Sequence, residues 1–368
     1  MAQPVHGPHR NRPAAPIQQQ RPPGRTIIYT LKSSTINDVA RLAGVSKRTV
    51  SRVINGSLAV GESTRVKVEK VIAELNYSPS PQARGLASSR SYLLGLIYDN
   101  PDALYLDDVQ RGVLEVCSQL GYELVVHPCR YRSETLVQDC FAFINRSKLD
   151  GVILLPPVSE LDHLAAALKQ AERPYVRLTS VLLDETYHSV VSDDRAAAAE
   201  MARYFAQLGH QNIAFISGPQ RYKSSTERME GFQLGLSAYG IKLRPDWVVE
   251  GNNSFETGIE CAQQLLSRAE KPTAIFANND QMAAGVLKAA HELGIKVPEQ
   301  LSVAGFDDNL LASRIIPALT TIRRPVRQMA QLAATKIIMD IEDNRHGAGH
   351  VAAKVAPTLV VRESTKRL

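Results

Sequence analysis

The sequence predicts a small all-α head that contains a helix-turn-helix, followed by a larger α/β body of two lobes. Residues 38–53, DVARLAGVSKRTVSRV, have the spacing of two short helices joined by a tight turn. From Leu93 onward, short apolar runs alternate with amphipathic stretches of helical period, which predicts parallel strands covered by helices on both faces. The 368 residues, 44% of them apolar, suffice for two or three domains with cores of their own.

Composition divides the chain into four segments. Residues 1–34 are rich in Pro, Gln and Arg and lack the apolar run of a secretion signal, so we expect a disordered basic tail. The helical head follows at 35–79, and the two-lobed body occupies 92–368. The connector at 80–91 is polar and small-sided; its composition favours a plain linker, although 81–88 has room for one or two helical turns.

The head is predicted from its capping and turn residues. Gly44 ends the first helix where a left-handed residue is needed, and Ser46 can cap the second helix through its side-chain oxygen. Asn55-Gly56 ends the second helix, and a third helix is expected from Ser63 to Leu75. The apolar positions that we expect to pack the three helices together are Ile36, Val39, Ala40, Leu42, Val45, Val50, Val53, Val66, Val68, Val71, Ile72 and Leu75.

The outer face of the second helix carries Lys47, Arg48, Ser51 and Arg52, donors suited to base edges and phosphates. An ordinary helical hairpin with a solvated basic face is the alternative. Charge distribution decides between them, because residues 1–34 hold five basic and no acidic residues and 35–92 hold nine basic and four acidic. The remainder holds 29 basic and 33 acidic residues, so all of the net charge of +6 lies in and beside the head. This distribution is typical of a phosphate-binding module attached to a mildly acidic body.

The body shows regular alternation. Strands are predicted at 93–98, 123–127, 151–155, 175–179, 213–217, 274–278 and 301–306, and helices at 107–120, 134–147, 160–172, 195–208, 226–239, 256–269 and 281–293. These are too many units for one compact sheet, so we expect two α/β lobes with a ligand cleft between them.

No pattern in the sequence indicates catalysis. The adjacent pairs Asp193-Asp194 and Asp307-Asp308 lie at strand ends, where neighbouring side chains point to opposite faces and cannot share a proton. His210 is expected to be a structural residue of a turn. No glycine-rich phosphate loop, metal-spaced His/Cys set or nucleophile elbow occurs, so we expect no catalytic residue, no metal and no cofactor.

The environment of the protein is indicated by two further observations. No apolar run approaches the length of a membrane span. The four cysteines (Cys117, Cys129, Cys140 and Cys261) have neither metal-ligand nor disulfide spacing, and we interpret them as buried thiols of a reducing cytoplasm.

Taken in order, the motifs resemble the LacI/GalR family of bacterial transcription repressors. The strings that carry the resemblance are TINDVARLAGVSKRTVSRVING, LNYSPSPQARGLAS, ANNDQMAAGVLKAAHELGIKVPEQLSVAGFDDN and PALTTIRRP. They span about residues 35–364 and include everything except the N-terminal tail. The resemblance implies a helix-turn-helix head and a body like the periplasmic binding proteins, with two α/β lobes around an effector.

The resemblance assigns roles in DNA binding. Lys47, Arg48 and Arg52 match positions that select operator bases, with Ser51 on the same face. Leu86 matches a wedge that is inserted into a central minor-groove step, and this implies a hinge helix over 80–91 that is ordered on the operator. The positions that match phosphate contacts are Thr35, Ser46, Asn55 and Thr64, and Ala83 and Arg84 lie on the hinge helix beside the groove.

The resemblance also implies an effector site. Arg228 matches an arginine that holds effector hydroxyls or a carboxylate, Asp307 its carboxylate partner across the cleft, and Asn279 a further polar contact. A pocket built of Arg, Asp and Asn suits a polyol, because each hydroxyl both donates and accepts. Tyr105 lies near the position of the family's first-lobe contacts and is expected to pack against a sugar ring. Asn253 lies where many members carry an aromatic platform, and Thr179 ends a strand without the usual acidic residue.

We therefore expect a cytoplasmic, homodimeric repressor that reads a near-palindromic operator under control of a carbohydrate effector. A purine or another metabolite that acts as a co-repressor is the alternative effector. A protein that binds or modifies sugars without a role on DNA is the alternative class, but an exported sugar-binding protein would need a signal and lack the head. A last strand is expected in the segment PTLVVRESTKRL. No leucine heptad follows it, which favours a dimer over a tetramer assembled through the tail.

Overall fold

A computed structural model describes residues 34–54, 57, 59–77, 90–100, 102–343 and 354–368. The chain divides into two compact units, Met1–Pro79 and Ser80–Leu368. Among the described residues, no helix combines the length and the apolar character that crossing a membrane requires. The asparagine at position 55 and the expected hinge residues Ala83, Arg84 and Leu86 lie outside the described residues, as do 1–33 of the expected tail.

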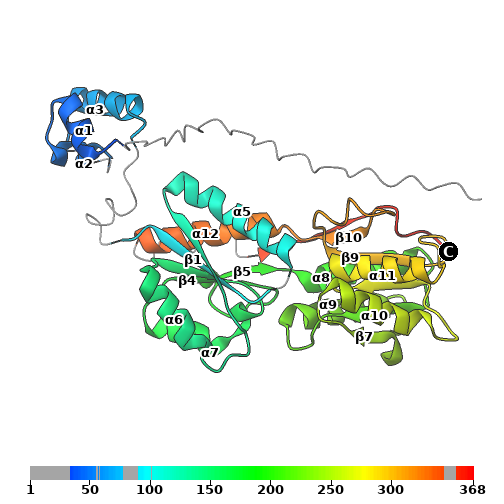
Figure 1. Ribbon diagram of the computed structural model, residues 1–368. Coiled ribbons are helices and arrows are strands. Elements are labelled where there is room, and N and C mark those ends of the chain that lie inside the picture. The colour runs from blue at the N-terminus through cyan, green and yellow to red at the C-terminus, as the bar shows by residue number, and fades with distance from the viewer. Residues whose placement is uncertain (1–33, 55–56, 58, 78–89, 101, 344–353) are drawn as a thin grey trace, which may run out of the picture. The chain divides into compact units, whose positions relative to one another are not determined.

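The first unit is a bundle of three helices, α1 (Ile36–Ala43), α2 (Lys47–Ile54) and α3 (Glu62–Glu74) (Figure 1). Thr35 and Asp38 form a reciprocal capping box at the start of α1, and Gly44 ends that helix at φ 64°. At the start of α2, Ser46 Oγ accepts a hydrogen bond from the Thr49 amide at 3.1 Å. The predicted helix-turn-helix is therefore confirmed, together with both of its cap residues.

The core of the head differs in part from the one that the sequence predicts. Its buried members are Val39, Ala40, Ala43, Val50, Val53, Val68 and Val71, with Ile36, Val45, Ile72 and Leu75 packed against them. The prediction was wrong for Leu42 and Val66, whose exposed fractions are 50% and 56%. Each sits at a helical spacing that suits the core, but three short helices have too little surface to cover every apolar residue.

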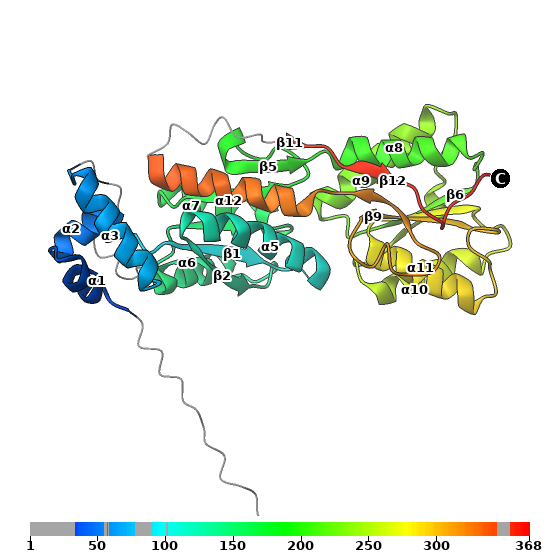
Figure 2. The ribbon, with the colours of Figure 1, turned by 90° about the horizontal axis from the view of Figure 1, so that it is seen from above.

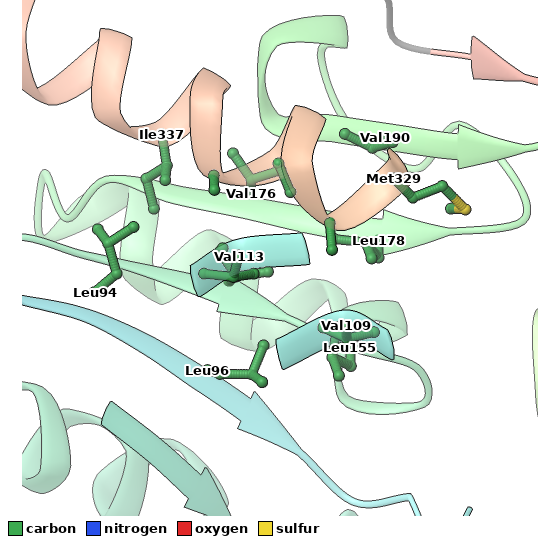
Figure 3. Packing of buried hydrophobic residues seen from close by; sticks show 14 of the residues in the cluster. Leu94, Leu96, Val109, Val113, Leu155, Val176, Leu178, Val190, Met329 and Ile337 are labelled. Carbon is green, nitrogen blue, oxygen red and sulfur yellow. The ribbon is translucent and has the colours of Figure 1, made fainter. Parts of the chain in front are cut away.

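The first lobe of the second unit is built on a six-stranded sheet of order β11-β5-β4-β3-β1-β2, parallel throughout. Helices α5 and α12 cover one face and α6 and α7 the other (Figure 1). Figure 3 shows the first of these layers, where Met329 and Ile337 of α12 pack with Val109 and Val113 of α5 above the apolar strands. The elements are β1 (Leu93–Tyr98), α5 (Ala103–Leu120), β2 (Glu123–Pro128), α6 (Leu136–Ser147), β3 (Gly151–Leu154), η1 (Val158–Glu160), α7 (Asp162–Gln170), β4 (Tyr175–Thr179), η2 (Thr186–His188), β5 (Ser189–Ser192), α12 (Val326–Asp343) and β11 (Lys354–Val355).

The second lobe repeats this plan with a sheet of order β12-β10-β9-β8-β6-β7. Helices α10 and α11 cover one face, and α8 and α9 the other (Figure 2). Only the pairing of β10 with β12 is antiparallel among the described strands. The elements are α8 (Asp194–Gln207), β6 (Ile213–Ser217), α9 (Lys223–Ser237), η3 (Pro245–Trp247), β7 (Val248–Glu250), α10 (Phe255–Leu266), β8 (Ala274–Ala277), α11 (Asp280–Glu292), β9 (Ser302–Asp307), β10 (Thr320–Arg323) and β12 (Thr358–Val360).

The chain passes between the lobes three times, from β5 to α8, from β10 to α12 and from β11 to β12. Two of these crossings lie together, because the Asp193 amide donates to the carbonyl of Val355 at 3.0 Å. The predicted all-α head and two-lobed α/β body are thus confirmed, and all fourteen predicted strands and helices of the body are present with ends shifted by a few residues. The prediction lacks α12 and the short strands β5, β7, β10 and β11, whereas β12 lies in the segment PTLVVRESTKRL, where the last strand was expected.

Candidate ligand cavity and nucleic-acid interface

A cavity of about 370 Å³ lies between the two lobes at the carboxyl ends of their parallel strands. In doubly wound sheets this edge is where ligands bind, because the loops that leave the strands converge there. The first lobe contributes Asp99, Asn100, Asp102, Tyr105, Pro156 and Pro157, the second lobe contributes Tyr222, Ser224, Arg228, Asn252, Asn253, Asn278, Asn279 and Asp307, and Arg324 comes from the crossing between β10 and α12.

Arg228 is the most firmly held cation of the cavity. It lies on α9, is only 3% exposed and is stacked on the ring of Phe306, with its Cζ 3.7 Å from the ring centroid. Its Nε donates to Asp194 Oδ2 at 3.0 Å, Nη1 donates to the carbonyl of Asn278, and Nη2 donates to Asp307 Oδ1 at 3.5 Å. Because every edge of the guanidinium has an acceptor, its position is set before any ligand arrives.

Asp194 is the buried counter-ion beneath the cavity. Burial opposes the ionisation of this fully buried carboxyl, but the charges of Arg228 and Arg324 hold its pKa below the ordinary value. Ser180 Oγ donates to it at 3.0 Å, and Ser192 Oγ donates to its other oxygen. Asp194 therefore stays charged and anchors Arg228 from below.

Arg324 brings a second guanidinium to the cavity, and it is held differently. Its exposed fraction is 7%, its Nη1 lies 3.6 Å from Asp307 Oδ1, and its Cζ lies 5.4 Å from the ring centroid of Tyr105. Among the described residues, its Nε and Nη2 have no hydrogen-bond acceptor. Burial opposes the charge of Arg324, but Asp194, Tyr105 and Asp307 raise its pKa, so the guanidinium remains a cation. Its Nε and Nη2 are available as hydrogen-bond donors.

Asp102 and Asp307 present carboxylates from opposite lobes. Asp102 caps α5, where its Oδ1 accepts from the amides of Leu104 at 3.0 Å and Tyr105 at 3.2 Å. Burial raises its pKa, and the negative charge of Asp307 raises it further. Asp307 ends β9 at φ 105°, in the left-handed region that a non-glycine residue rarely adopts. A ligand with hydroxyl or amino donors would relieve the repulsion between these two carboxyl groups.

Asparagines form the wall of the second lobe. Asn253 accepts from Asn278 Nδ2 through its side chain at 2.8 Å and from Asn279 Nδ2 through its carbonyl at 2.9 Å. Asn279 also caps α11, since its Oδ1 accepts from the Met282 amide at 2.9 Å. The backbone of Gly218 packs against these asparagines. A Cβ at position 218 would lie 2.5 Å from Asn253 Oδ1, so a larger residue would displace the Asn253 side chain. The amides therefore shape the wall, with Asn278 Oδ1 left without a partner among the described residues.

The structure brings all five predicted residues of this site, Tyr105, Arg228, Asn253, Asn279 and Asp307, to one cavity. One part of the prediction was wrong: Asp307 does not face Arg228 across the cleft, because both belong to the second lobe and their side chains are bonded. Sequence reasoning missed Asp102 and Arg324. Polar residues that directly follow predicted strands were the available signal for Asp102, whereas Arg324 follows β10, a strand that was not predicted.

The groups that resemble catalytic residues have structural partners. His210 is 1% exposed and hydrogen-bonded at both ring nitrogens, to Thr273 Oγ1 at 2.9 Å and to Ser302 Oγ at 3.0 Å. Asp193 forms an ion pair with Lys354, and Asp308 pairs with Arg323 and Arg362, each at 2.6 Å. In both adjacent Asp pairs the two carboxyl groups therefore contact different cations. Within the described ranges, no cluster of three His, Cys, Asp or Glu side chains is placed to hold a metal.

The cysteines behave largely as predicted. Cys117, Cys140 and Cys261 are buried free thiols, and Cys129 is half-buried. Burial raises their pKa values, to about 12 for Cys117 and Cys129 and to about 11 for Cys140 and Cys261. Thiols with such pKa values are almost entirely protonated at neutral pH and react slowly.

The outer face of α2 in the head is basic. Lys47, Arg48 and Arg52 are exposed, Ser51 is half-buried, and in the described part of the chain none of the three cations forms an ion pair. Helix α2 contains no acidic residue. A helix with a dense, unpaired cationic face suits the major groove and the phosphates that border it.

Three of the predicted phosphate contacts lie at helix starts. The hydroxyls of Thr35 and Ser46 are already used in caps, with Thr35 Oγ1 donating to Asp38 Oδ2 at 2.7 Å and Ser46 Oγ sharing a hydrogen bond with Thr49 Oγ1 at 2.9 Å. Thr64 is half-buried in the first turn of α3. Helix N-termini offer free backbone N–H groups, which bind phosphate oxygens. Asn55 and the hinge positions lie outside the described residues.

Comparison with known proteins also separates a DNA-binding head from a ligand-binding body. The family described as bacterial regulatory proteins, lacI family, matches residues 35–80, and the periplasmic binding protein-like domain matches residues 202–365. A relative from Bacillus subtilis (strain 168), the probable HTH-type transcriptional repressor ExuR, is 32% identical over 91% of this chain and 99% of its own.

Two solved structures have the same architecture. The lac repressor dimer bound to operator and the anti-inducer ONPF is similar with a TM-score of 0.72 and 30% identity, over 91% of this chain and 100% of that one. The complex of the transcriptional regulator CelR with cellobiose is similar with a TM-score of 0.66 and 28% identity, over 90% and 99%. This chain therefore belongs to the LacI family of bacterial regulatory proteins and is a helix-turn-helix DNA-binding transcriptional repressor.

Proposed function

We propose that the affinity of this repressor for its operator is controlled by a small, hydroxyl-rich effector that binds between the lobes. The observation that supports this most is the composition of the cavity, in which carboxylates of Asp102 and Asp307 lie near the guanidinium groups of Arg228 and Arg324. A hydroxyl group both donates and accepts, so one polyol can satisfy acceptors and donors that no single-function ligand would satisfy. Cellobiose occupies the solved CelR complex, which supports a carbohydrate here.

In this proposal, Arg228 and Arg324 donate to effector oxygens, while Asp102 and Asp307 accept from effector hydroxyls. Tyr105 supports Arg324 from the first lobe, and Asn253 and Asn279 hold the wall of the second. Because the polar groups come from both lobes, an effector bound to all of them favours the closed cleft over the open one.

On DNA, we propose that Lys47, Arg48 and Arg52 read bases in the major groove, with Ser51 beside them. Thr35, Ser46, Asn55 and Thr64 fix the register on the phosphates, and the hinge residues Ala83, Arg84 and Leu86 contact the minor groove. An operator-bound dimer of the similar lac repressor supports this arrangement.

We also propose a homodimer on a near-palindromic operator. Apolar side chains that remain exposed on the first lobe support it: Leu114 and Leu120 on α5 and Val126 on the neighbouring edge strand β2 have exposed fractions of 41–44%. Exposed apolar residues gathered on adjacent elements are typical of surfaces that a partner covers. Two-fold symmetry would then place two heads on successive half-sites.

The proposed effector class is tested by thermal-shift screening of the full chain against monosaccharides, disaccharides, sugar phosphates and nucleobases. A ligand that binds only the native state raises the melting temperature. We expect a neutral carbohydrate to raise it in the wild type and to lose this effect in Asp307→Asn. The matched control is Asp246→Asn, an exposed carboxyl group outside the cavity. A nucleobase that stabilises the protein in place of every carbohydrate would contradict the proposed class.

A further inference from the structure

The two lobes are joined by a direct contact that does not involve the cavity-lining groups discussed above. Glu160, in the η1 turn of the first lobe, places its Oε2 2.9 Å from the backbone amide of Lys223 in the second lobe, which donates to it. The η1 turn directly follows Pro156 and Pro157, and Lys223 begins α9, the helix that carries Ser224 and Arg228. This contact therefore links the cavity-lining segments of the two lobes.

A second contact between the lobes lies beside it. The rings of Tyr131 and Tyr222 meet edge to face, with centroids 6.0 Å apart and planes at 88°. The Tyr131 amide donates to Asp99 Oδ2 at 2.7 Å, and the guanidinium of Arg221 lies 4.8 Å from the centroid of the Tyr222 ring. Asp99 and Tyr222 both line the cavity, so this aromatic pair lies at its edge.

Glu160 is a half-buried acid whose carboxyl group lacks a full set of partners. Among the described residues its Oε1 has no hydrogen-bond donor. Burial raises the pKa of Glu160 to about 7, although the amides of Lys223 and Ser224 and the charges of Lys223 and Arg177 act in the opposite direction. The other titratable and charged groups of this region are Tyr131, Arg132, Arg221 and Tyr222, and Asp162 and Asp184, which pair with Arg177.

We propose that Glu160 is a positioning residue of the cavity, which fastens the first lobe to the N-terminus of α9 and thereby holds the cleft closed over the ligand site. An acceptor at this terminus binds a backbone N–H that the helix itself cannot satisfy, and the contact is lost when the lobes separate. The assignment concerns cleft closure and holds for any ligand that the cavity takes.

The direction of the pH dependence follows from linkage. In this structure burial of the carboxyl group raises the pKa of Glu160 to about 7, and opening the cleft would expose that group to water and lower its pKa towards the ordinary value of 4.5. The closed form then binds the proton more tightly, so closure strengthens as the pH falls towards 6. Between pH 8 and pH 6 the ratio of closed to open molecules should rise about tenfold.

The test measures cleft closure in the full chain without ligand. Fluorescent dyes are attached through non-natural amino acids at two exposed helix positions, Gln138 on α6 and Gln264 on α10, and energy transfer between them is followed from pH 8 to pH 6. We expect the closed fraction of the wild type to rise as the pH falls. Glu160→Gln keeps an acceptor for the Lys223 amide without the charge, so this variant should stay closed at both pH values.

Two further variants separate positioning from general effects on the fold. Glu134→Gln removes an exposed carboxyl group of the same lobe and should retain the profile of the wild type. Glu160→Ala should remain open at both pH values and should lose amide protection over 221–226 in hydrogen exchange at a fixed pH, whereas Glu160→Gln retains it. A pH profile that Glu160→Gln leaves unchanged, or equal protection in Glu160→Ala and the wild type, would overturn the assignment.

Discussion

At the scale of the residue, the pair Arg228–Asp194 is the structural centre of the cavity. Removing one member of a buried ion pair leaves the other charged and unpaired, which costs about 3–5 kcal/mol. We therefore expect Arg228→Met to lower the free energy of unfolding by about that amount in urea denaturation, in addition to abolishing the effector response. The double variant with Asp194→Asn should recover part of the loss.

The matched control for this prediction is Arg111→Met on α5, whose ion-pair partner Asp107 is exposed, as Arg111 itself is. Exposed ion pairs contribute about 0–1 kcal/mol, so the control should be nearly neutral. Equal losses in the two single variants would mean that the Arg228–Asp194 pair does not have the stabilising role described here.

His210 gives the folded protein a predictable dependence on pH. Burial lowers the pKa of His210, while its bond to the Lys366 carbonyl acts in the opposite direction. The unfolded chain then binds the proton more tightly, so the contribution of His210 is complete above its ordinary pKa of 6.5 and is lost as the pH falls below it. We expect the melting temperature to fall from pH 7 to pH 5 and to fall less steeply in His210→Gln. The exposed His163→Gln should keep the slope of the wild type; an unchanged slope in His210→Gln would contradict this account.

At the scale of the element, helix α2 contains the side chains that we propose to read operator bases. An arginine that pairs bidentately with guanine contributes about 1–3 kcal/mol of discrimination. We expect Arg48→Ala or Arg52→Ala to weaken binding to an operator obtained by selection from random DNA by about that free energy, and to relax the base preference at one position of each half-site. Fluorescence anisotropy against a panel of single-base operator variants measures both effects.

The control is Lys70→Ala on α3, an exposed lysine within the same unit that pairs with Glu74. A variant that affects only general electrostatic attraction weakens binding to all sequences alike. If Arg48→Ala and Arg52→Ala also weaken binding to all operator variants equally, base reading by these two arginines is excluded.

The elements also show what the sequence alone can predict. Buried parallel strands such as β3 and β8 are continuous apolar runs, and amphipathic helices such as α10 bury one face, so both were predicted. Helix α12 was missed because it contacts α5 and three strands at once, and a helix covered on several sides shows no one-sided apolar pattern. Strands of two to four residues, such as β11 and β10, are too short to show a period.

The residues of the candidate site likewise include some that the sequence predicts and others that it does not. Arg228 and Asp307 were predicted because they lie in motifs that resemble a family, and no feature of their local sequence marks a cavity. Arg324 was missed because it lies in a crossing between lobes that depends on β10 and α12. Sequence spacing does not show that Asp194, Asp307 and Arg324 meet, since this requires all three chain crossings to be in place.

At the scale of the whole molecule, a cationic head is linked in sequence to a mildly acidic body whose two lobes enclose a polar cavity. The proposed control of the head by this cavity is an allosteric coupling, and such a coupling must act equally in both directions. The fold change that the effector causes in operator affinity must equal the fold change that the operator causes in effector affinity.

The most direct test of this central claim therefore measures both fold changes with one effector and one operator. Operator binding is followed by anisotropy with and without saturating effector, and effector binding by calorimetry with and without saturating operator. The account predicts one common factor different from 1 for the wild type, and a factor of 1 in Asp307→Asn, with its operator affinity unchanged. An effector that binds the wild type tightly and leaves operator affinity unchanged would contradict it.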